Sequence, residues 1–384
     1  MRPIMVVLFV DALGWRLARS RPGFAAELPH RREIATILGF SSGALPTAFS
    51  GRLPREHGRW LMYRRAGLEP SPFSHFEHLR WLPPRLRRSW RLSRWLTRVV
   101  ERRGVRGYFN LYEVPVEELP RFDLAEKADL FAPGGLPVET LWDVLARRGV
   151  RWRGWNWRTP EERALAELRG RVAAGEEDFL FLYTADLDAL LHREGSRGEG
   201  VRARLDRYGA WLRELLAAPR PHGRPLWIYL CSDHGMVDVV ETVDVRARLR
   251  ALPERPGRDY VAFYDSTMAR FWWRSAGARA AVQAALAAEP RGRWLGADER
   301  AREGVDFRAA EYGDDVFLLR PGALLLPSYM GSRPVAAMHG YDAAHPDMTA
   351  LLASNRELPE DVRHLADLRG FLERELDAQR AEAA

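Results

Sequence analysis

The sequence of 384 residues is short of cysteine, of lysine and of long apolar runs. Cys231 is the one cysteine, so no disulfide can form within the chain and a disulfide-stapled framework is excluded. No stretch approaches the roughly 20 apolar residues that cross a bilayer. The apolar run 4–10 also lacks the length and the cleavage site of a signal peptide. We therefore expect the protein to be cytoplasmic.

Basic residues exceed acidic ones by 59 to 52, which gives a formal net charge of +7. Nearly all the basic residues are arginines, since Lys127 is the single lysine. A basic surface favours phosphates, nucleic acid or anionic lipid, but net charge does not choose among them. Hydrophobic residues make up 46% of the chain, enough for a large core. We expect one domain over residues 1–384 that carries insertions.

Three apolar runs are each followed closely by acidic residues. The runs 4–10, 179–183 and 225–230 have the composition of strands that are buried on both faces of a parallel sheet. They lead to these potential ligands: Asp11; Asp188 with His192 one helical turn later; and Asp233 with His234. Each alone could be a helix cap or a surface hydrogen bond. Because the carboxyl ends of parallel strands meet at one edge of a sheet, acids at three such ends indicate a metal site.

A short segment of small and apolar residues, 41–51, opens on Ser41 and Ser42 and ends on glycine. The segment is typical of a short buried helix. A hydroxyl at a helix N-terminus meets unpaired N–H groups and the positive end of the dipole, which favours an alkoxide and an incoming phosphate. An ordinary serine cap is the alternative.

Tryptophan alternates with arginine over residues 60–105, most densely between 85 and 103. The spacing predicts an amphipathic basic helix over 88–103. Such a helix can lie on an anionic membrane surface, grip a polyanion, or dock its tryptophans on the protein body with its arginines in solvent. We interpret residues 60–135 as an inserted lid and residues 240–330 as a second, smaller insertion.

Together, the motifs resemble the alkaline phosphatase superfamily, in particular its type I phosphodiesterase/nucleotide pyrophosphatase branch. They follow the order of that family: Asp11, the block that ends at Ser50-Gly51, Asp188-x-x-x-His192, Ser232-Asp233-His234-Gly235-Met236, and Met338-His339-Gly340. The resemblance implies an α/β fold, with a mostly parallel central sheet and helices on both faces. It also implies a metal-dependent phosphoric ester hydrolase.

The resemblance further implies roles for single residues. The nucleophile of the family lies nine residues before the Thr or Ser of a "TG" pair, which selects Ser41 here, with Ser42 as the alternative. The serine attacks phosphorus to give a covalent phospho-enzyme. One metal ion is assigned to Asp188, His192 and His339, and a second to Asp11, the serine, Asp233 and His234. We expect two zinc ions, while manganese suits the same nitrogen and oxygen ligands.

Two departures from related patterns bear on the substrate. Nucleotide pyrophosphatases place an Asn three residues after the nucleophile, where this chain has Ala44, or Leu45 if Ser42 attacks. The Pro and Arg of the sulfatase motif are absent from residues 41–45. We expect a phosphate-ester small molecule or a phosphorylated glycan or lipid as substrate, and no nucleic acid. The alternatives are a phospho-group transferase with a glycan or lipid acceptor, and a non-catalytic polyanion-binding protein.

Overall fold

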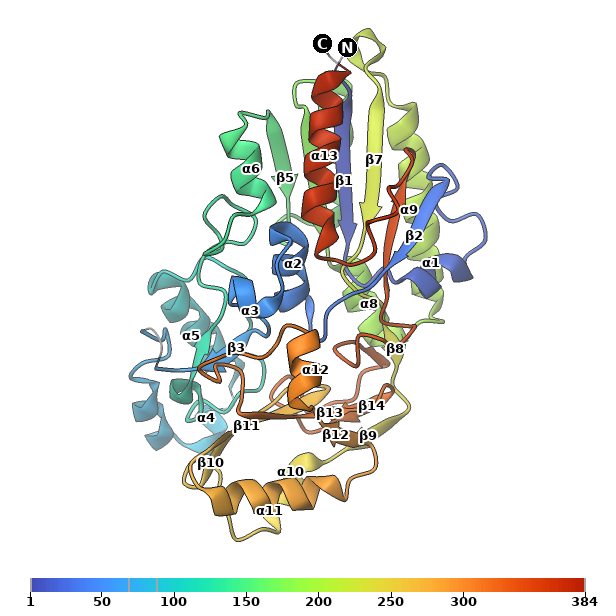
Figure 1. Cartoon of the computed structure of the whole chain (residues 1–384). Helices are drawn as coiled ribbons and strands as arrows, with labels where there is room; N and C mark the ends of the chain where they lie inside the picture. The colour runs from blue at the N-terminus through green and yellow to red at the C-terminus, as the bar shows by residue number, and fades with distance from the viewer. Residues whose placement is uncertain (1, 68–69, 88, 383–384) are drawn as a thin grey trace.

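The computed structural model describes residues 2–67, 70–87 and 89–382 (Figure 1). Its centre is a six-stranded sheet of order β2-β16-β7-β1-β6-β5. The strands are β1 (Ile4–Val10), β2 (His30–Ile34), β5 (Trp152–Trp155), β6 (Phe179–Thr184), β7 (Leu226–Cys231) and β16 (Ala350–Ser354). Strands β7, β1, β6 and β5 are parallel, whereas β16 is antiparallel to both of its neighbours. The expected α/β fold with a mostly parallel sheet is confirmed.

Helices cover both faces of this sheet, which explains why its inner strands are apolar throughout. In β1, Val6 and Leu8 point to one core and Val7 and Phe9 point to another. The first core contains side chains of α7 (Glu161–Ala174), α8 (Asp186–Glu194) and α9 (Glu199–Ala217). The second contains side chains of α2 (Ser41–Ser50), α6 (Leu141–Arg147) and α13 (Asp367–Ala381). Figure 1 shows α13 lying along β1.

A second lobe is built on an antiparallel sheet of order β10-β11-β13-β12, at the bottom of Figure 1. Its strands are β10 (Tyr260–Tyr264), β11 (Met268–Trp273), β12 (Gly292–Trp294) and β13 (Asp315–Leu319), and helix α11 (Ala276–Ala287) packs on them. The same core includes side chains from residues 63–124. The segments 60–135 and 240–330 therefore share one hydrophobic core.

The remaining elements, apart from helix α5, are short. The helical ones are α1 (Trp15–Ser20), α3 (Pro54–His57), η1 (Phe76–Trp81), α4 (Pro84–Arg87), α5 (Trp90–Arg102), η2 (Leu119–Arg121), α10 (Val245–Arg250), η3 (Pro221–Gly223) and α12 (Ala297–Arg302). The strands are β3 (Tyr63–Arg65), β4 (Phe122–Leu124), β8 (Val237–Asp238), β9 (Glu241–Val243), β14 (Ala323–Leu325) and β15 (Ala337–Met338). Among the described residues, no helix combines the length and the apolar composition that crossing a membrane requires.

Helix α5 corrects one interpretation of the tryptophan- and arginine-rich segment. Its predicted start, Arg88, lies outside the described residues. Leu96 and Val100, four residues apart on one face, are buried in the core of the second lobe. Trp90 and Trp95 point to solvent instead and are 66% and 50% exposed. Docking of the tryptophans of this helix on the body is therefore wrong, because its aliphatic side chains make that contact.

An extended segment precedes the terminal helix α13 (Asp367–Ala381). Residues 363–365 pair with Ala35 through two backbone hydrogen bonds, Ala35 N to Arg363 O and Leu365 N to Ala35 O, both 2.8 Å long. An extended backbone at this bridge cannot be helical, so α13 begins only at Asp367. Residues 383–384 lie outside the described residues.

A buried ion pair joins the two sequence segments of the second lobe. The Arg270 guanidinium donates to Asp265 at 2.7 Å and to the backbone oxygen of Tyr63 at 2.8 Å. All three groups are shielded from solvent. Burial raises the pKa of Asp265, and the positive charge of Arg270 offsets part of that rise. The pair connects β11 to β3 and holds residues 60–135 against the lobe.

We expect Arg270→Leu to lower the free energy of unfolding by about 3–5 kcal/mol, because it leaves the Asp265 carboxylate buried without a partner. Urea denaturation followed by tryptophan fluorescence measures this change. Arg21→Ala serves as the control, since Arg21 and Asp206 form an exposed pair that should contribute less than about 1 kcal/mol. Equal effects in the two variants would contradict the role of the buried pair.

Candidate active site

The carboxyl ends of β1, β6 and β7 bring the predicted ligands to one edge of the central sheet. Asp11 follows β1, helix α8 follows β6, and Asp233 follows β7 by two residues. His339 enters from the loop after β15. Two groups result, Asp188 with His192 and His339, and Asp11 with Asp233 and His234. Within each group the potential ligand atoms all lie within 4.8 Å of one another.

In the first group, two imidazoles face one carboxylate oxygen. His192 Nε2 lies 3.3 Å and His339 Nε2 lies 3.6 Å from Asp188 Oδ1. His192 Nδ1 donates to the backbone oxygen of Ala337 at 2.8 Å. Because a carbonyl oxygen only accepts, this bond places the proton of the neutral imidazole on Nδ1, so that Nε2 is the nitrogen that offers a lone pair to a cation.

In the second group, His234 Nε2 lies 3.4 Å from both Asp11 Oδ1 and Asp233 Oδ2. Its Nδ1 donates to the backbone oxygen of Gly235 at 3.0 Å, which again leaves Nε2 without a proton. Asp233 Oδ1 accepts from the backbone N–H groups of Ala12 and His234. These bonds fix the carboxylate so that Oδ2 faces the imidazole.

The two groups touch through their histidines. The rings of His234 and His339 are stacked with centroids 3.9 Å apart, and those of His192 and His339 lie 5.3 Å apart. Phe40, directly before α2, meets the His339 ring edge-on at 5.2 Å. Two cation sites built on these groups would therefore be immediate neighbours, as an in-line displacement between two metal ions requires.

Close backbone contact positions the loops that follow β1 and β7. A methyl group on Gly235 would lie 2.1 Å from the backbone oxygen of Asp347, and one on Gly14 would lie 2.6 Å from the Cα of Gly235. Glycine at both positions lets these loops pack directly on each other. This contact joins the two loops just beyond Asp11 and Asp233.

Three neighbouring carboxylates, two of them buried and that of Asp188 half-buried, make the site electrostatically unfavourable in the absence of cations. Burial raises the pKa of Asp11 well above its usual value, and the negative charges of Asp233 and Asp188 raise it further. Burial also opposes ionisation of Asp188, but the neighbouring imidazoles, that of His192 above all, lower its pKa to about 2. Burial and the neighbouring His234 hold the pKa of His339 well below its usual value, so its imidazole is neutral.

These residues fit divalent cations. Asp188 Oδ1, Asp233 Oδ2 and His339 Nδ1 are buried and have no hydrogen-bond partner among the described residues. Buried polar atoms are almost always satisfied, so three unsatisfied ones within a single site need an explanation. Carboxylate oxygen and neutral imidazole are common ligands of zinc and of other divalent metals. Cations at the two groups would satisfy Asp188 Oδ1 and Asp233 Oδ2 and cancel the repulsion between the carboxylates.

The structure separates the two candidate serines. Ser41, the first residue of α2, has its Oγ 3.0 Å from His234 Nε2 and 3.3 Å from Asp11 Oδ2. Ser42 turns the other way, and its hydroxyl donates to the backbone oxygen of Trp60 at 3.3 Å. Only Ser41 therefore faces the second ligand group.

Tyr183 is a further residue at this site, which the sequence does not predict: its hydroxyl donates to Asp11 Oδ2 at 2.5 Å. The residue lies in the apolar run of β6, where a tyrosine looks like any other core aromatic. The parallel register pairs it with Phe9, two residues before Asp11, on the next strand. The contact follows from the pairing of β1 with β6, and the sequence alone does not predict that pairing.

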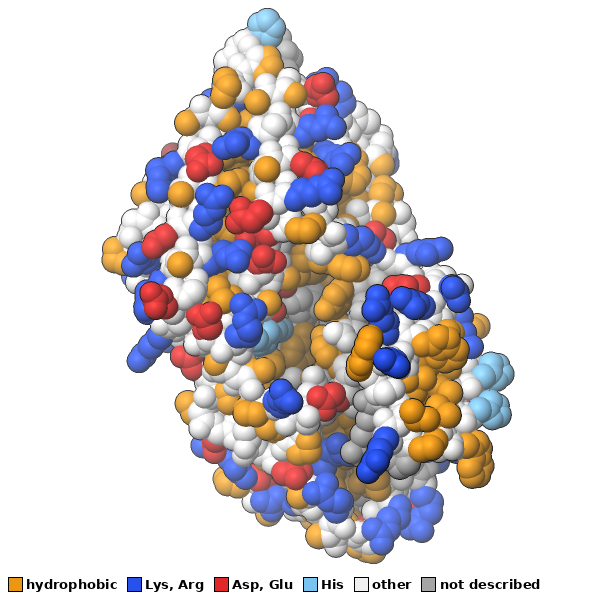
Figure 2. Space-filling view, turned by 180° about the vertical axis from the view of Figure 1, so that it is seen from behind, with side chains coloured by type: hydrophobic (Ala, Val, Ile, Leu, Met, Phe, Trp, Pro, Cys, Tyr) orange, Lys and Arg blue, Asp and Glu red, His pale blue; other side chains and the backbone are white. Residues whose placement is uncertain are grey.

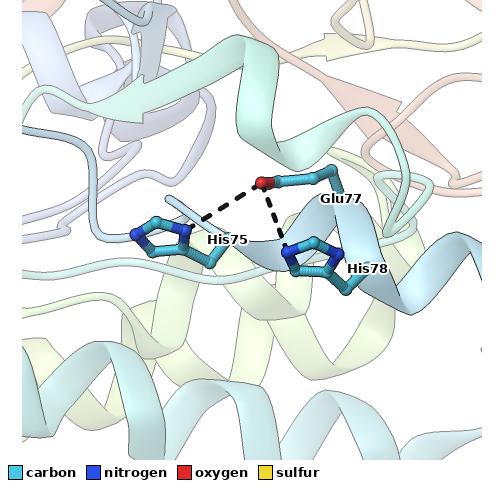
Figure 3. A group of neighbouring side chains, drawn as sticks. All are labelled: His75, Glu77 and His78. Atoms are coloured by element: carbon cyan, nitrogen blue, oxygen red, sulfur yellow. Dashed lines mark ion pairs between the residues drawn. The ribbon is translucent and has the colours of Figure 1, made fainter.

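A third group of potential ligands lies on the surface, in the segment 60–135 (Figure 3). Glu77 points one carboxylate oxygen toward His75 and His78, at 4.0 and 3.8 Å. The side chains of His75 and His78 are 79% and 75% exposed. Water can donate hydrogen bonds to these exposed side chains and accept hydrogen bonds from them. They therefore lack the buried polar atoms without hydrogen-bond partners that the two buried groups contain.

Buried carboxylates and imidazoles beside a helix-terminal serine, at the carboxyl edge of an α/β sheet, define a hydrolase of the alkaline phosphatase fold. The chain belongs to the type I phosphodiesterase/nucleotide pyrophosphatase family, whose model matches residues 41–303. It is accordingly a phosphoric ester hydrolase, of a family that depends on divalent metals. Asp11 and His339 lie outside the matched range.

Solved structures support the same fold. Human ectonucleotide pyrophosphatase/phosphodiesterase 5 matches with a TM-score of 0.65 at 15% identity, covering 98% of this chain and 95% of that one. The mouse enzyme matches with a TM-score of 0.64 at the same identity and coverage. So does an inactive Thr-to-Ala variant of the mouse enzyme in complex with AMP. Comparison with curated proteins finds no match.

We expect Tyr183→Phe to weaken the binding of divalent metal ions by about 10- to 100-fold, because a lost hydrogen bond to a carboxylate that binds metal typically has this effect. Competition with a chromogenic chelator measures the affinity. Tyr229→Phe is the matched control, since Tyr229 is an equally buried strand tyrosine whose hydroxyl donates to Glu375, away from both groups. A similar loss of affinity in both variants would show that general destabilisation, and not the Asp11 contact, is responsible.

Proposed function

We propose that the chain is a two-metal phosphodiesterase with Ser41 as its nucleophile. The observation that carries the proposal is the position of Ser41 Oγ, which contacts both Asp11 and His234 at the N-terminus of α2. Ser42, the alternative from sequence, instead donates to a backbone carbonyl on the far side of the helix. The proposal includes no nucleophilic role for Ser42.

One metal ion would be held by Asp188, His192 and His339, and the other by Asp11, Ser41, Asp233 and His234. We propose zinc, because each group combines imidazole nitrogen with carboxylate oxygen, a set that manganese also accepts. The chemistry that such ions supply is Lewis-acid stabilisation of the phosphoryl oxygens and a lower pKa of the serine hydroxyl.

Ser41 would form a bond from Oγ to phosphorus while the bond from phosphorus to one ester oxygen breaks, and the serine proton would end on the departing alcohol. The product of this step is a seryl phosphodiester that keeps the second ester group of the substrate. Water would then cleave the bond between Oγ and phosphorus, which regenerates the hydroxyl and releases a phosphomonoester. The hydrogen bond between Ser41 and Asp11 orients Oγ for attack. The backbone N–H groups of Ser41 and Ser42 donate to no acceptor among the described residues, so they are available to the phosphoryl oxygens.

The proposed substrate is a small phosphodiester. The family description names phosphodiesters and nucleotide pyrophosphates, and the mouse relative was solved with AMP. Position 44 argues against simple transfer of nucleotide specificity, because Ala44 offers no amide to a phosphoryl oxygen. We therefore place the phosphodiester bond, and not the nucleotide, at the centre of the proposal. A phosphorylated glycan or lipid fits the same chemistry.

Ser41→Ala should abolish metal-dependent hydrolysis of bis(p-nitrophenyl) phosphate, with kcat/KM reduced by at least about a thousandfold, because the covalent step has no nucleophile. Ser42→Ala is the matched control. Its kcat/KM should stay within about threefold of wild type, since the Ser42 hydroxyl only donates a hydrogen bond to the backbone oxygen of Trp60. The assay is release of p-nitrophenol, run in parallel with the monoester.

Retention of activity in Ser41→Ala with loss in Ser42→Ala would overturn the choice of nucleophile. A metal-loaded wild type that turns over neither ester would favour the transferase with a glycan or lipid acceptor over the hydrolytic mechanism proposed here.

The metal assignment predicts that Asp188→Asn combined with His192→Ala lowers the zinc content from two ions per chain to one, because it removes two of three ligands from one group. Metal analysis after gel filtration in zinc-buffered solution measures the content. His75→Ala combined with His78→Ala is the control, and it should leave the content unchanged because that cluster is exposed. Loss of zinc only from the control would reassign the site to the surface.

A further inference from the structure

We propose that the outer surface of η1, α4 and α5 binds the headgroup region of an anionic lipid bilayer. This surface, called here the Trp/Arg face, consists of the following side chains: Trp81, Leu86, Trp90 and Trp95, with Arg80, Arg85, Arg91, Arg94 and Arg98. The hydrolytic activity proposed above does not require it. The two proposals can therefore fail separately.

Large apolar side chains are concentrated on this face. Trp81, Leu86, Trp90 and Trp95 are 76%, 53%, 66% and 50% exposed. They are half of the large hydrophobic side chains that are exposed among the described residues, and they fall within fifteen consecutive positions. In Figure 2 hydrophobic side chains gather at the lower right, over this segment, with arginines beside them. Clustered exposed apolar side chains mark interaction surfaces, whereas scattered ones do not.

The arginines of this face have no protein counter-charge. Arg80, Arg85, Arg91, Arg94 and Arg98 are all exposed, and none pairs with a carboxylate within the described part of the chain. The arginines of other helices, such as Arg163, Arg169 and Arg207, do pair with acidic side chains. Between residues 76 and 103 the only acidic side chains are Glu77 and Glu101. The face therefore carries an uncompensated positive charge.

Arginine and tryptophan are also coupled on this face. The Arg80 guanidinium lies 4.8 Å from the ring centroid of Trp81, and that of Arg91 lies 5.8 Å from the ring of Trp90. Tryptophan prefers the boundary between headgroups and acyl chains, and arginine binds the phosphates just above that level. Neighbouring pairs of the two suit this boundary.

Packing fixes the direction in which α5 presents these side chains. Leu96 and Val100 are buried in the core of the second lobe, so the apolar stripe of the helix is already covered. The tryptophan side chains cannot turn into the core without displacing Leu96 and Val100. The face therefore binds as a preformed surface, and no folding of the helix accompanies binding.

A bilayer explains this composition better than a nucleic acid does. Tryptophan can stack on bases and arginine can bind phosphates in either case. Leu86 can neither stack on a base nor bind a phosphate. It lies between Trp81 and Trp90 in the sequence, and its side chain is more than half exposed. An aliphatic side chain gains free energy only from an apolar environment, which headgroups with acyl chains supply.

The test is sedimentation of the full-length protein with vesicles of phosphatidylcholine alone and of phosphatidylcholine mixed with phosphatidylserine. Wild type should sediment only with the mixed vesicles, and less at high salt. Because each arginine near an anionic surface adds to the attraction, Arg91→Gln with Arg94→Gln and Arg98→Gln should lower the partition coefficient by about a hundredfold. The control replaces three exposed arginines elsewhere, Arg202, Arg302 and Arg308, by Gln and should retain binding.

A second variant tests the apolar contribution. Trp81→Ser with Trp90→Ser should also lose vesicle binding, by about tenfold or more, because both rings leave water on binding. Val240→Ser, at a position that is 79% exposed elsewhere, is its control. All variants should hydrolyse a soluble phosphodiester at the wild-type rate, which separates this test from the proposed catalytic mechanism.

Three results would overturn the proposal. Sedimentation with neither vesicle type, or equally with both, would show that no anionic bilayer is recognised. Equal loss in the arginine variant and its control would reduce the effect to net charge. Binding to vesicles that survives the tryptophan variant, together with tighter binding to single-stranded DNA, would identify a polyanion surface.

Discussion

Mutual repulsion of three carboxylates is the constraint around which this protein is organised. Asp11 and Asp233 are buried and Asp188 is half-buried after adjacent strands, where burial and the neighbouring carboxylates raise the pKa of Asp11. The surrounding structure opposes this repulsion with positive or neutral partners and keeps the carboxylates in place: imidazoles fixed by backbone carbonyls, and a tyrosine hydroxyl donated to Asp11. The fold supplies the rigidity, since the strands that carry the acids are covered by helices on both faces.

The sequence predicts the parts of this arrangement that follow from local rules. Strands that are buried on both faces read as apolar runs, so β1, β6 and β7 and the acids after them are visible in the sequence. The helix that begins at Ser41 and the i,i+4 pair Asp188 and His192 are equally local. The family spacing selects Ser41 over Ser42, but local rules do not separate these two serines, because their orientation depends on how α2 packs against Trp60 and His234.

What the sequence does not predict depends on tertiary pairing. Strand β2 (His30–Ile34) is too polar to read as a strand, and it exists because β16 pairs with it. Tyr183 contacts Asp11 only through the β1–β6 register. In α5 the helical period is right, but the sequence leaves open whether the tryptophans pack on the body, and the smaller Leu96 and Val100 occupy the buried face. The available core space, and not hydrophobicity alone, decided which side chains went inside.

The shared core of the second lobe has a consequence for the order in which the protein matures. Residues 63–124 leave the ribosome more than a hundred positions before residues 243–329, the segment on which they pack. Until that later segment is synthesised, Tyr63, Leu96 and Val100 have no complete core, and they are exposed to whatever else binds apolar surface. Thr267, from the late segment, then anchors the His339 loop by donating to the Gly340 carbonyl at 2.8 Å. Nascent chains of this protein should therefore depend on chaperone protection during translation, and completion of the catalytic edge comes last.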